Sequence, residues 1–165
     1  MLTEISGIFV KIVFAEDAHL PLTTGAPNRP AARFNRPGQD ALYLSPGVDS
    51  ARVAIGEYVK EQDRPRVIVQ YEIDRCLLFD LRSDDAAAIY ELARQPWQSA
   101  NKQGIDPPSW EAADKLRKAG HTGLIDPSRQ QPGLWHITLF RWNEVGAPYI
   151  REIGTPAPIQ ISPKP

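Results

Sequence analysis

The sequence is poor in cysteine, in net charge and in long apolar runs, and each shortage narrows the possible function classes. Cys76 is the single cysteine among 165 residues, so the chain can form no internal disulfide. Its strand-like setting, "IDRCLLFDL", predicts a buried inert thiol rather than a nucleophile. The formal net charge of −1 supplies no basic surface, so we expect no direct contact with nucleic acid.

No segment has the pattern of a signal peptide or a membrane span. The apolar run near the N-terminus, "GIFVKIVFA", is short, is interrupted by Lys11 and follows no basic region. We therefore expect a cytoplasmic protein that makes no contact with membranes.

The common motifs of catalysis and cofactor binding are also missing. No glycine pattern fits a P-loop or a Rossmann turn, and no nucleophile elbow is present. His19, His121 and His136 lie far apart, and none has a second ligand at a metal-binding spacing. We expect no metal site.

The apolar patterns that are present predict short strands and helices in mixed order. Strands are expected over residues 7–15, 41–45, 65–73, 76–81 and 134–140. Helices are expected over residues 46–62, 83–102 and 110–120, with Asp49 or Ser50 capping the first, Ser83 capping the second and Gly120 ending the third. Residues 16–40, rich in proline and glycine, should form an ordered loop.

This order of elements predicts an α+β fold with mainly antiparallel sheets, because strands and helices do not alternate regularly. No internal repeat and no linker divides the chain, so we expect a single domain over residues 1–153. The remaining segment, "GTPAPIQISPKP" (154–165), is rich in proline and predicts a flexible or extended tail outside the fold.

Polar residues in the turn-rich segments are the remaining candidates for a site. They are Arg33, Asn35, Tyr43, Ser45, Glu57 and Ser128. Taken singly, each has an ordinary explanation: Arg33 fits a solvated loop, Tyr43 fits a core position and Ser128 fits a turn that bonds its own backbone. Glu57 lies beside the apolar stripe of its predicted helix, so it either reaches solvent or points into a cleft.

Taken together, these segments resemble the RES domain, a family named for its Arg, Glu and Ser residues. The stretch "ARFNRPGQDALYLSPGVDSARVAIGE" (32–57) is similar to the front half of that domain, with its Arg-Phe-Asn, Pro-Gly turn, Leu-Tyr-x-Ser strand and Ala-x-x-Glu helix. The stretch "WEAADKLRKAGHTGLIDPSRQQPGLWHITLF" (110–140) is similar to its closing segment, with a Pro-Ser pair, a Pro-Gly pair and a last strand ending in Leu-Phe.

The resemblance implies an ADP-ribosyltransferase-like fold, in which two small sheets flanked by helices form a cleft for NAD+. Members of the family are mostly toxins of bacterial toxin–antitoxin pairs. They cleave NAD+ as phosphorylases or hydrolases, or transfer ADP-ribose to a protein. The expected partners are therefore NAD+ and a cognate antitoxin that covers the cleft, with inorganic phosphate as a second substrate in phosphorolysis and with no metal.

The resemblance also implies roles for the candidate residues. The three residues of the family name correspond to Arg33, Glu57 and Ser128, which are the expected catalytic residues. Arg33 would bind the pyrophosphate as well, with Asn35, Tyr43, Ser45 and Lys11 as further NAD-binding residues; Tyr43 would stack on the nicotinamide ring. Glu57 would face the positive charge that develops on the ribose, and Ser128 would orient the ribose or Glu57.

Two departures from the family pattern keep other readings open. Lys11 replaces an Arg of the first strand, and Gln130 replaces an Arg that follows the Ser. One alternative is a protein ADP-ribosyltransferase, and another is a catalytically weak module that binds a nucleotide or a protein. A third is a domain without a site, in which the candidate side chains do not converge.

Overall fold

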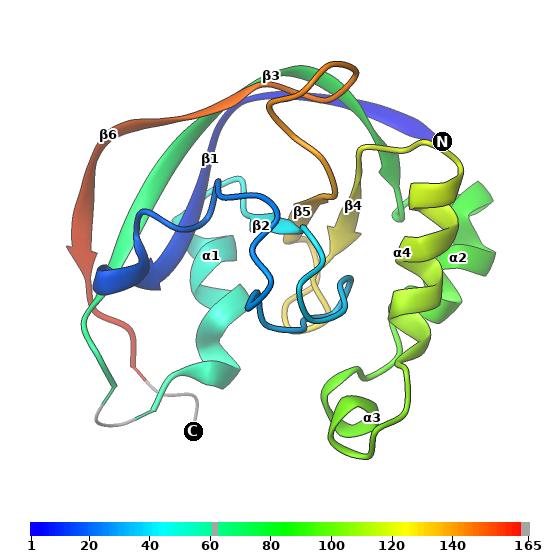
Figure 1. Ribbon diagram of the computed structural model, residues 1–165, viewed down its shortest axis with the longest axis horizontal. Helices are drawn as coiled ribbons and strands as arrows, with labels where there is room; N and C mark the ends of the chain where they lie inside the picture. The colour runs from blue at the N-terminus through cyan, green and yellow to red at the C-terminus, as the bar shows by residue number, and fades with distance from the viewer. Residues whose placement is uncertain (61–62, 163–165) are drawn as a thin grey trace.

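The computed structural model describes residues 1–60 and 63–162, except for the side chain of Glu57 (Figure 1). Within this part of the chain the strands are β1 (Leu2–Phe14), β2 (Leu42–Leu44), β3 (Arg66–Asp80), β4 (Gly123–Pro127), β5 (Trp135–Leu139) and β6 (Ile150–Ile159). The helices are α1 (Val48–Ile55), α2 (Ala87–Ala93), α3 (Gln98–Lys102) and α4 (Pro108–Lys118). Short 3-10 turns are Ala15–Asp17 (η1), Gly56–Tyr58 (η2) and Asp84–Ala86 (η3). The α+β class is confirmed.

The strands form one six-stranded sheet in the order β1-β3-β4-β5-β2, with β6 also paired to β3. Every pairing is antiparallel except that of β3 with β4. We expected two small sheets, and this expectation is corrected. The reason is that the end of β3 pairs with β4 through Phe79 and Asp80. This pairing joins the short strands β4, β5 and β2, called the inner strands below, to the long strands β1, β3 and β6, called the outer strands.

The outer strands are longer than the apolar patterns predicted. Residues 65–73 and 76–81 were expected as separate strands, but β3 runs without a break through Asp74 and Arg75. Pairing with β1 on both sides of this point, from Leu2 opposite Phe79 to Phe14 opposite Arg66, supplies the backbone partners that keep it extended. Figure 1 shows β1, β3 and β6 arching together over the inner strands.

The proline-rich C-terminal segment is part of the sheet, and the prediction of a tail from residue 154 is corrected as far as Ile159. Residues 150–159 form β6, which pairs antiparallel with β3 from Ile150 opposite Ile73 to Ile159 opposite Arg66. Proline lacks the N–H that a central strand needs, but it is tolerated on a strand at the sheet edge. Pro156 and Pro158 therefore did not exclude a strand here.

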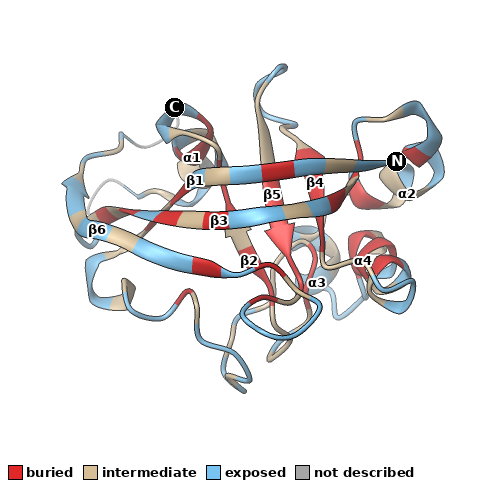
Figure 2. Cartoon of the chain, turned by 90° about the horizontal axis from the view of Figure 1, so that it is seen from above, coloured by how far each residue is buried: buried red, intermediate tan, exposed pale blue. Residues whose placement is uncertain are grey.

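Two large apolar clusters hold the layers together, and a smaller one forms around Val10, Ile12 and Ala51. One lies under the outer strands around Phe9, Tyr71 and Leu42; the other lies between the sheet and helices α2 and α4, around Leu116 and Leu124. Figure 2 shows the buried residues concentrated on β4, β5 and the inner side of α4, whereas β1, β3 and β6 alternate between buried and exposed positions. This alternation is the period-2 pattern of strands that face solvent on one side.

Helix boundaries follow backbone geometry more than the predicted side-chain caps. Gly47 occupies the N-cap of α1 with no side-chain cap bond, so neither Asp49 nor Ser50 caps this helix. Ser83 precedes η3 rather than an α-helix, and its hydroxyl donates to the Asp80 carbonyl. Gly120 takes a positive φ of 89° after α4, as the predicted helix end requires. None of the helices among the described residues has the length and apolarity needed to cross a bilayer.

Candidate active site

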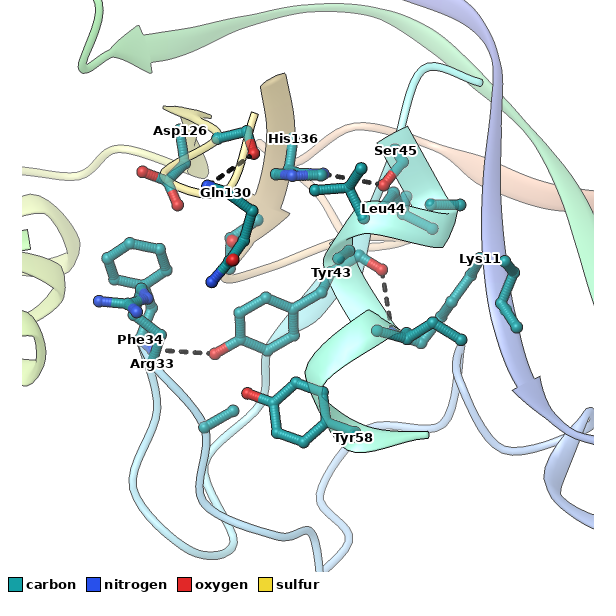
Figure 3. A pocket seen from close by; sticks show the side chains of 18 of the residues that line it. Lys11, Arg33, Phe34, Tyr43, Leu44, Ser45, Tyr58, Asp126, Gln130 and His136 are labelled. Carbon is teal, nitrogen blue, oxygen red and sulfur yellow. Dashed lines mark hydrogen bonds between the residues drawn. The ribbon is translucent and has the colours of Figure 1, made fainter. Parts of the chain in front are cut away.

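A cavity of about 360 Å³ lies between α1, the inner strands and the loop that precedes β2. Five of the residues expected to contact a ligand line it: Lys11, Arg33, Tyr43, Ser45 and Ser128. They come from β1, that loop, β2 with its next residue, and the segment after β4, so the fold joins positions far apart in the sequence. Figure 3 shows the Tyr43 ring at the centre, with Arg33 on one side and Lys11 on the other.

Arg33 is held at the end of helix α2. Its Nη1 donates to the carbonyl oxygens of Ala93, at 3.2 Å, and Gln95, at 2.8 Å. The carbonyl groups at a helix C-terminus carry partial negative charge, which favours a cation there. The guanidinium of Arg33 is thereby fixed in the cavity wall, and the structure does not support the reading of a solvated loop residue.

Tyr43 is anchored through its hydroxyl group, which donates to Asn35 Oδ1 at 2.7 Å and accepts the backbone N–H of Phe34 at 2.9 Å. Burial raises the pKa of the Tyr43 phenol well above its ordinary value, so the hydroxyl keeps its proton. Asn35 is buried and donates to the carbonyls of Pro30 and Arg36. Asn35 is not among the described residues that line the cavity. It supports Tyr43 by accepting the hydrogen bond of the Tyr43 hydroxyl.

Lys11 brings an amine to the other side of the Tyr43 ring. Its Nζ donates to the Tyr43 carbonyl at 3.0 Å and lies 5.7 Å from the centre of the ring. Burial, and secondarily the charge of Arg29, lowers the pKa of Lys11 to about 8. The amine is therefore charged at neutral pH and loses this charge under mildly alkaline conditions.

Ser45 and His136 meet in the cavity wall, with the Ser45 hydroxyl oxygen 3.0 Å from His136 Nδ1. Burial, and to a lesser extent the charge of Arg129, lowers the pKa of His136 to about 4. The imidazole is therefore neutral at pH 7 and adds no cation to the site.

Ser128 forms the turn that its sequence setting suggested, and it also lines the cavity. Its hydroxyl oxygen accepts the backbone N–H groups of Gln130, at 3.3 Å, and Gln131, at 3.2 Å. A hydroxyl that accepts two bonds still has its proton to donate. Both readings of Ser128 are therefore compatible with its position.

An ion pair that the sequence analysis did not identify lies beside Ser128. Arg129 binds Asp126 through two nitrogens at 2.9 and 3.1 Å, and its Nη2 also donates to the Ala93 carbonyl. Burial raises the pKa of Asp126, against the opposing effect of Arg129 and Arg33. Two guanidinium groups thus meet at Ala93, with the Asp126 carboxylate offsetting part of their repulsion.

Glu57 belongs to turn η2 (Gly56–Tyr58), but its side chain lies outside the described part of the structure. Its neighbours Ile55 and Tyr58 both line the cavity. The predicted convergence is therefore seen for Arg33, Tyr43 and Ser128, and the orientation of Glu57 stays a prediction. For those three residues, the reading of a domain whose candidate side chains do not converge is wrong.

Sequence reasoning also missed Asp126, His136, Tyr58 and Trp97 as cavity residues. The first two lie opposite each other in the pairing of β4 with β5, which a single sequence does not reveal. The polar Asp126 within the apolar run "GLIDP" was the one local signal, because a charged residue in a buried strand needs a partner.

The family model of the RES domain matches residues 10–161. The chain belongs to the RES domain family. This match spans every cavity residue named above and the whole of β6. No curated protein sequence matches the chain.

The RES chain also resembles a solved structure, the MbcT toxin in the MbcT–MbcA toxin–antitoxin complex of M. tuberculosis. The TM-score is 0.62 at 14% sequence identity, over 96% of this chain and 86% of MbcT. At this level of identity the likeness concerns the fold: the α+β arrangement is shared.

Proposed function

We propose that this RES domain is an enzyme that cleaves the nicotinamide–ribose bond of NAD+. The observation that carries the proposal is the shared cavity: Arg33, Tyr43 and Ser128, three positions of the family pattern, line one space of about 360 Å³. A volume of this order is typical of small-molecule sites. The match of residues 10–161 to the RES domain adds the expectation of NAD+ chemistry.

The proposed reaction requires an acidic residue near the ribose and does not require a strong nucleophile from the protein. Breaking the bond between ribose and nicotinamide passes through an oxocarbenium-like transition state, as glycoside cleavage does. In the proposed arrangement the Glu57 carboxylate faces this positive charge and holds the ribose hydroxyls. The surrounding apolar residues of the cavity, among them Val10, Ile12 and Ile55, strengthen this interaction because they exclude water.

The remaining groups position the substrate. Arg33 offers a fork of donors suited to a pyrophosphate, and the half-buried Tyr43 ring offers a face for nicotinamide. Ser128 orients the ribose or Glu57, and Ser45 and Lys11 complete the wall. The Tyr43 hydroxyl is committed to Phe34 and Asn35, so the proposed contact of Tyr43 is made by its ring.

The same proposal includes a biological context. The protein is a toxin, its cavity is an ADP-ribosyltransferase-like cleft, and an antitoxin controls its activity. The structural likeness to the toxin of the MbcT–MbcA complex supports it, together with membership of the RES family. A cognate antitoxin would inhibit the enzyme by covering the cavity, and the protein would act in the cytoplasm, where NAD+ is available.

The test is to follow NAD+ concentration with purified protein, with and without inorganic phosphate, and to compare Glu57→Ala. We expect NAD+ loss that falls by about 100-fold or more in Glu57→Ala, the scale of losing one electrostatic contact to the transition state. Acceleration by phosphate identifies phosphorolysis, and indifference to phosphate identifies hydrolysis.

Two results would contradict the proposal. If Glu57→Ala degrades NAD+ at the wild-type rate, the assigned role of Glu57 is wrong. If the wild type leaves NAD+ intact under both conditions, the cleavage activity is wrong. Transfer of radiolabelled ADP-ribose to protein would then point to an ADP-ribosyltransferase, and its absence to a binding module.

A further inference from the structure

Trp97 lines the same cavity as Arg33 and Tyr43, and none of the steps above uses it. It is half-buried and directly precedes α3, in the connection from α2. The other tryptophans serve the packing of the protein. Trp110 and Trp142 are buried with their indole N–H groups bonded to backbone carbonyls, and Trp135 contacts Phe9 edge to face.

The backbone connects Trp97 to the guanidinium group of Arg33. Arg33 donates to the carbonyl of Gln95 at 2.8 Å, and Trp97 follows Gln95 by two residues. Two peptide steps span at most about 7.6 Å between Cα atoms. The backbone of Trp97 therefore lies close to the Arg33 guanidinium at the end of α2, and its side chain lines the same cavity.

The order of the side chains along the cavity indicates which part of a dinucleotide would lie near Trp97. Figure 3 shows Arg33 on one side of the Tyr43 ring, while Lys11 lies on the opposite side of it and Tyr58 below it. A dinucleotide with its pyrophosphate at Arg33 and its nicotinamide on Tyr43 must extend its second nucleoside past Arg33. Two aromatic residues that line the cavity lie in that region, Phe34 and Trp97. Phe34 is almost fully buried, whereas Trp97 is half-buried and keeps a surface on which a base can stack.

We propose, resting on the proposed function, that Trp97 is the stacking platform for the adenine base and so makes the cavity selective for adenine dinucleotides over shorter substrates. An indole ring offers a large flat face, and stacking of a base on such a face contributes substantially to nucleotide affinity. Trp97 contacts the part of the substrate remote from the bond that breaks, so it affects binding rather than the chemical step.

Binding tests this subsite without requiring catalysis. The probes are ADP, which carries adenosine and a diphosphate, and inorganic pyrophosphate, which carries no base. We expect Trp97→Ala to weaken ADP about tenfold, the scale of losing one base stack, and to leave pyrophosphate affinity unchanged, as measured by calorimetry. Trp97→Phe keeps an aromatic face and should retain most of the ADP affinity.

Tyr149→Ala is the matched control. Tyr149 is an aromatic residue 57% exposed just before β6, outside the cavity lining, so its loss should change neither affinity. In kinetics, Trp97→Ala should raise KM for NAD+ about tenfold at unchanged kcat. Equal ADP affinity in wild type and Trp97→Ala overturns the subsite, and so does an equal loss for ADP and pyrophosphate. Failure of the wild type to cleave NAD+ overturns the proposed function instead, and the ADP result still decides the subsite.

Discussion

The ring and the hydroxyl group of Tyr43 contribute to different properties of the protein. The hydroxyl joins the Phe34 backbone to the Asn35 amide, and the ring lines the cavity. Buried polar groups are stable only when they are paired, so this small network holds the loop before β2 in place. This network explains the sequence motif Arg-Phe-Asn: Arg33 and the buried Phe34 line the cavity, whereas Asn35 is buried outside the lining and holds the Tyr43 hydroxyl.

In the proposed site, we expect Lys11 to make the binding of NAD+ sensitive to alkaline pH. Burial and the charge of Arg29 lower its pKa to about 8, so its positive charge disappears as pH rises through that value. We expect KM for NAD+ to rise between about pH 7 and pH 9.5 in the wild type. In Lys11→Arg it should stay nearly constant over this range, because an arginine keeps its charge. Steady-state kinetics of both proteins at several pH values measure the difference.

The expected rise of KM with pH is not a consequence of the protein losing stability at alkaline pH. In the unfolded chain Lys11 keeps its proton up to its ordinary pKa of 10.5, so between about 8 and that value the unfolded state binds more protons. This group therefore adds stability as pH rises through the window. His136, with a pKa of about 4, stays neutral there. A wild-type KM that is flat across pH 8, or one that rises in parallel in Lys11→Arg, would disprove the assignment.

At the scale of elements, β6 supports the cavity from outside. Ile159, at its end, packs with Val10, Ile12 and Ala51, a cluster whose three residues also line the cavity. Figure 1 shows β6 running beside β3 on the side of the molecule that holds α1. The last strand therefore contributes to the shape of a site that it does not itself line.

We expect Ile159→Asp to destabilise the protein by about 2–4 kcal/mol, because it places an unpaired charge against an apolar cluster. Thr155→Asp makes the same change at an exposed position of the same strand and should alter stability by less than about 0.5 kcal/mol. Urea unfolding measures both values. Equal stability of the two variants would show that the contact of β6 with this cluster contributes nothing.

At the scale of the whole molecule, the cavity described above is lined by β1, β2, α1 and the segments before β2 and after β4, so the proposed action depends on the fold of the chain as a whole. We expect that its expression in a bacterial host without an antitoxin lowers cellular NAD+ and arrests growth. Glu57→Ala should restore both, because the fold remains while the stabilisation of the transition state is lost. Growth curves with parallel NAD+ assays provide the measurement. Growth arrest by Glu57→Ala at normal NAD+ would separate toxicity from NAD+ cleavage.

By itself the sequence determined the elements whose signals are local. The Pro-Gly turn, the short strand at Leu42–Leu44, the helix ending at Gly120 and the resemblance to the RES domain were all readable from neighbouring residues. Turn chemistry and the positive φ of glycine act over a few positions, so a single sequence contains them. The candidates Arg33, Tyr43 and Ser128 were found in the same way.

Only the tertiary structure decided which of these residues meet. The union of β3 into one strand, the place of β6 in the sheet and the Asp126–Arg129 pair depend on contacts between distant segments. Local patterns do not contain such contacts, because a strand gains its hydrogen bonds and a buried charge gains its partner from elsewhere in the chain. Trp97 shows the same limit of local patterns: its position in the cavity follows from the end of α2, where the Arg33 guanidinium binds.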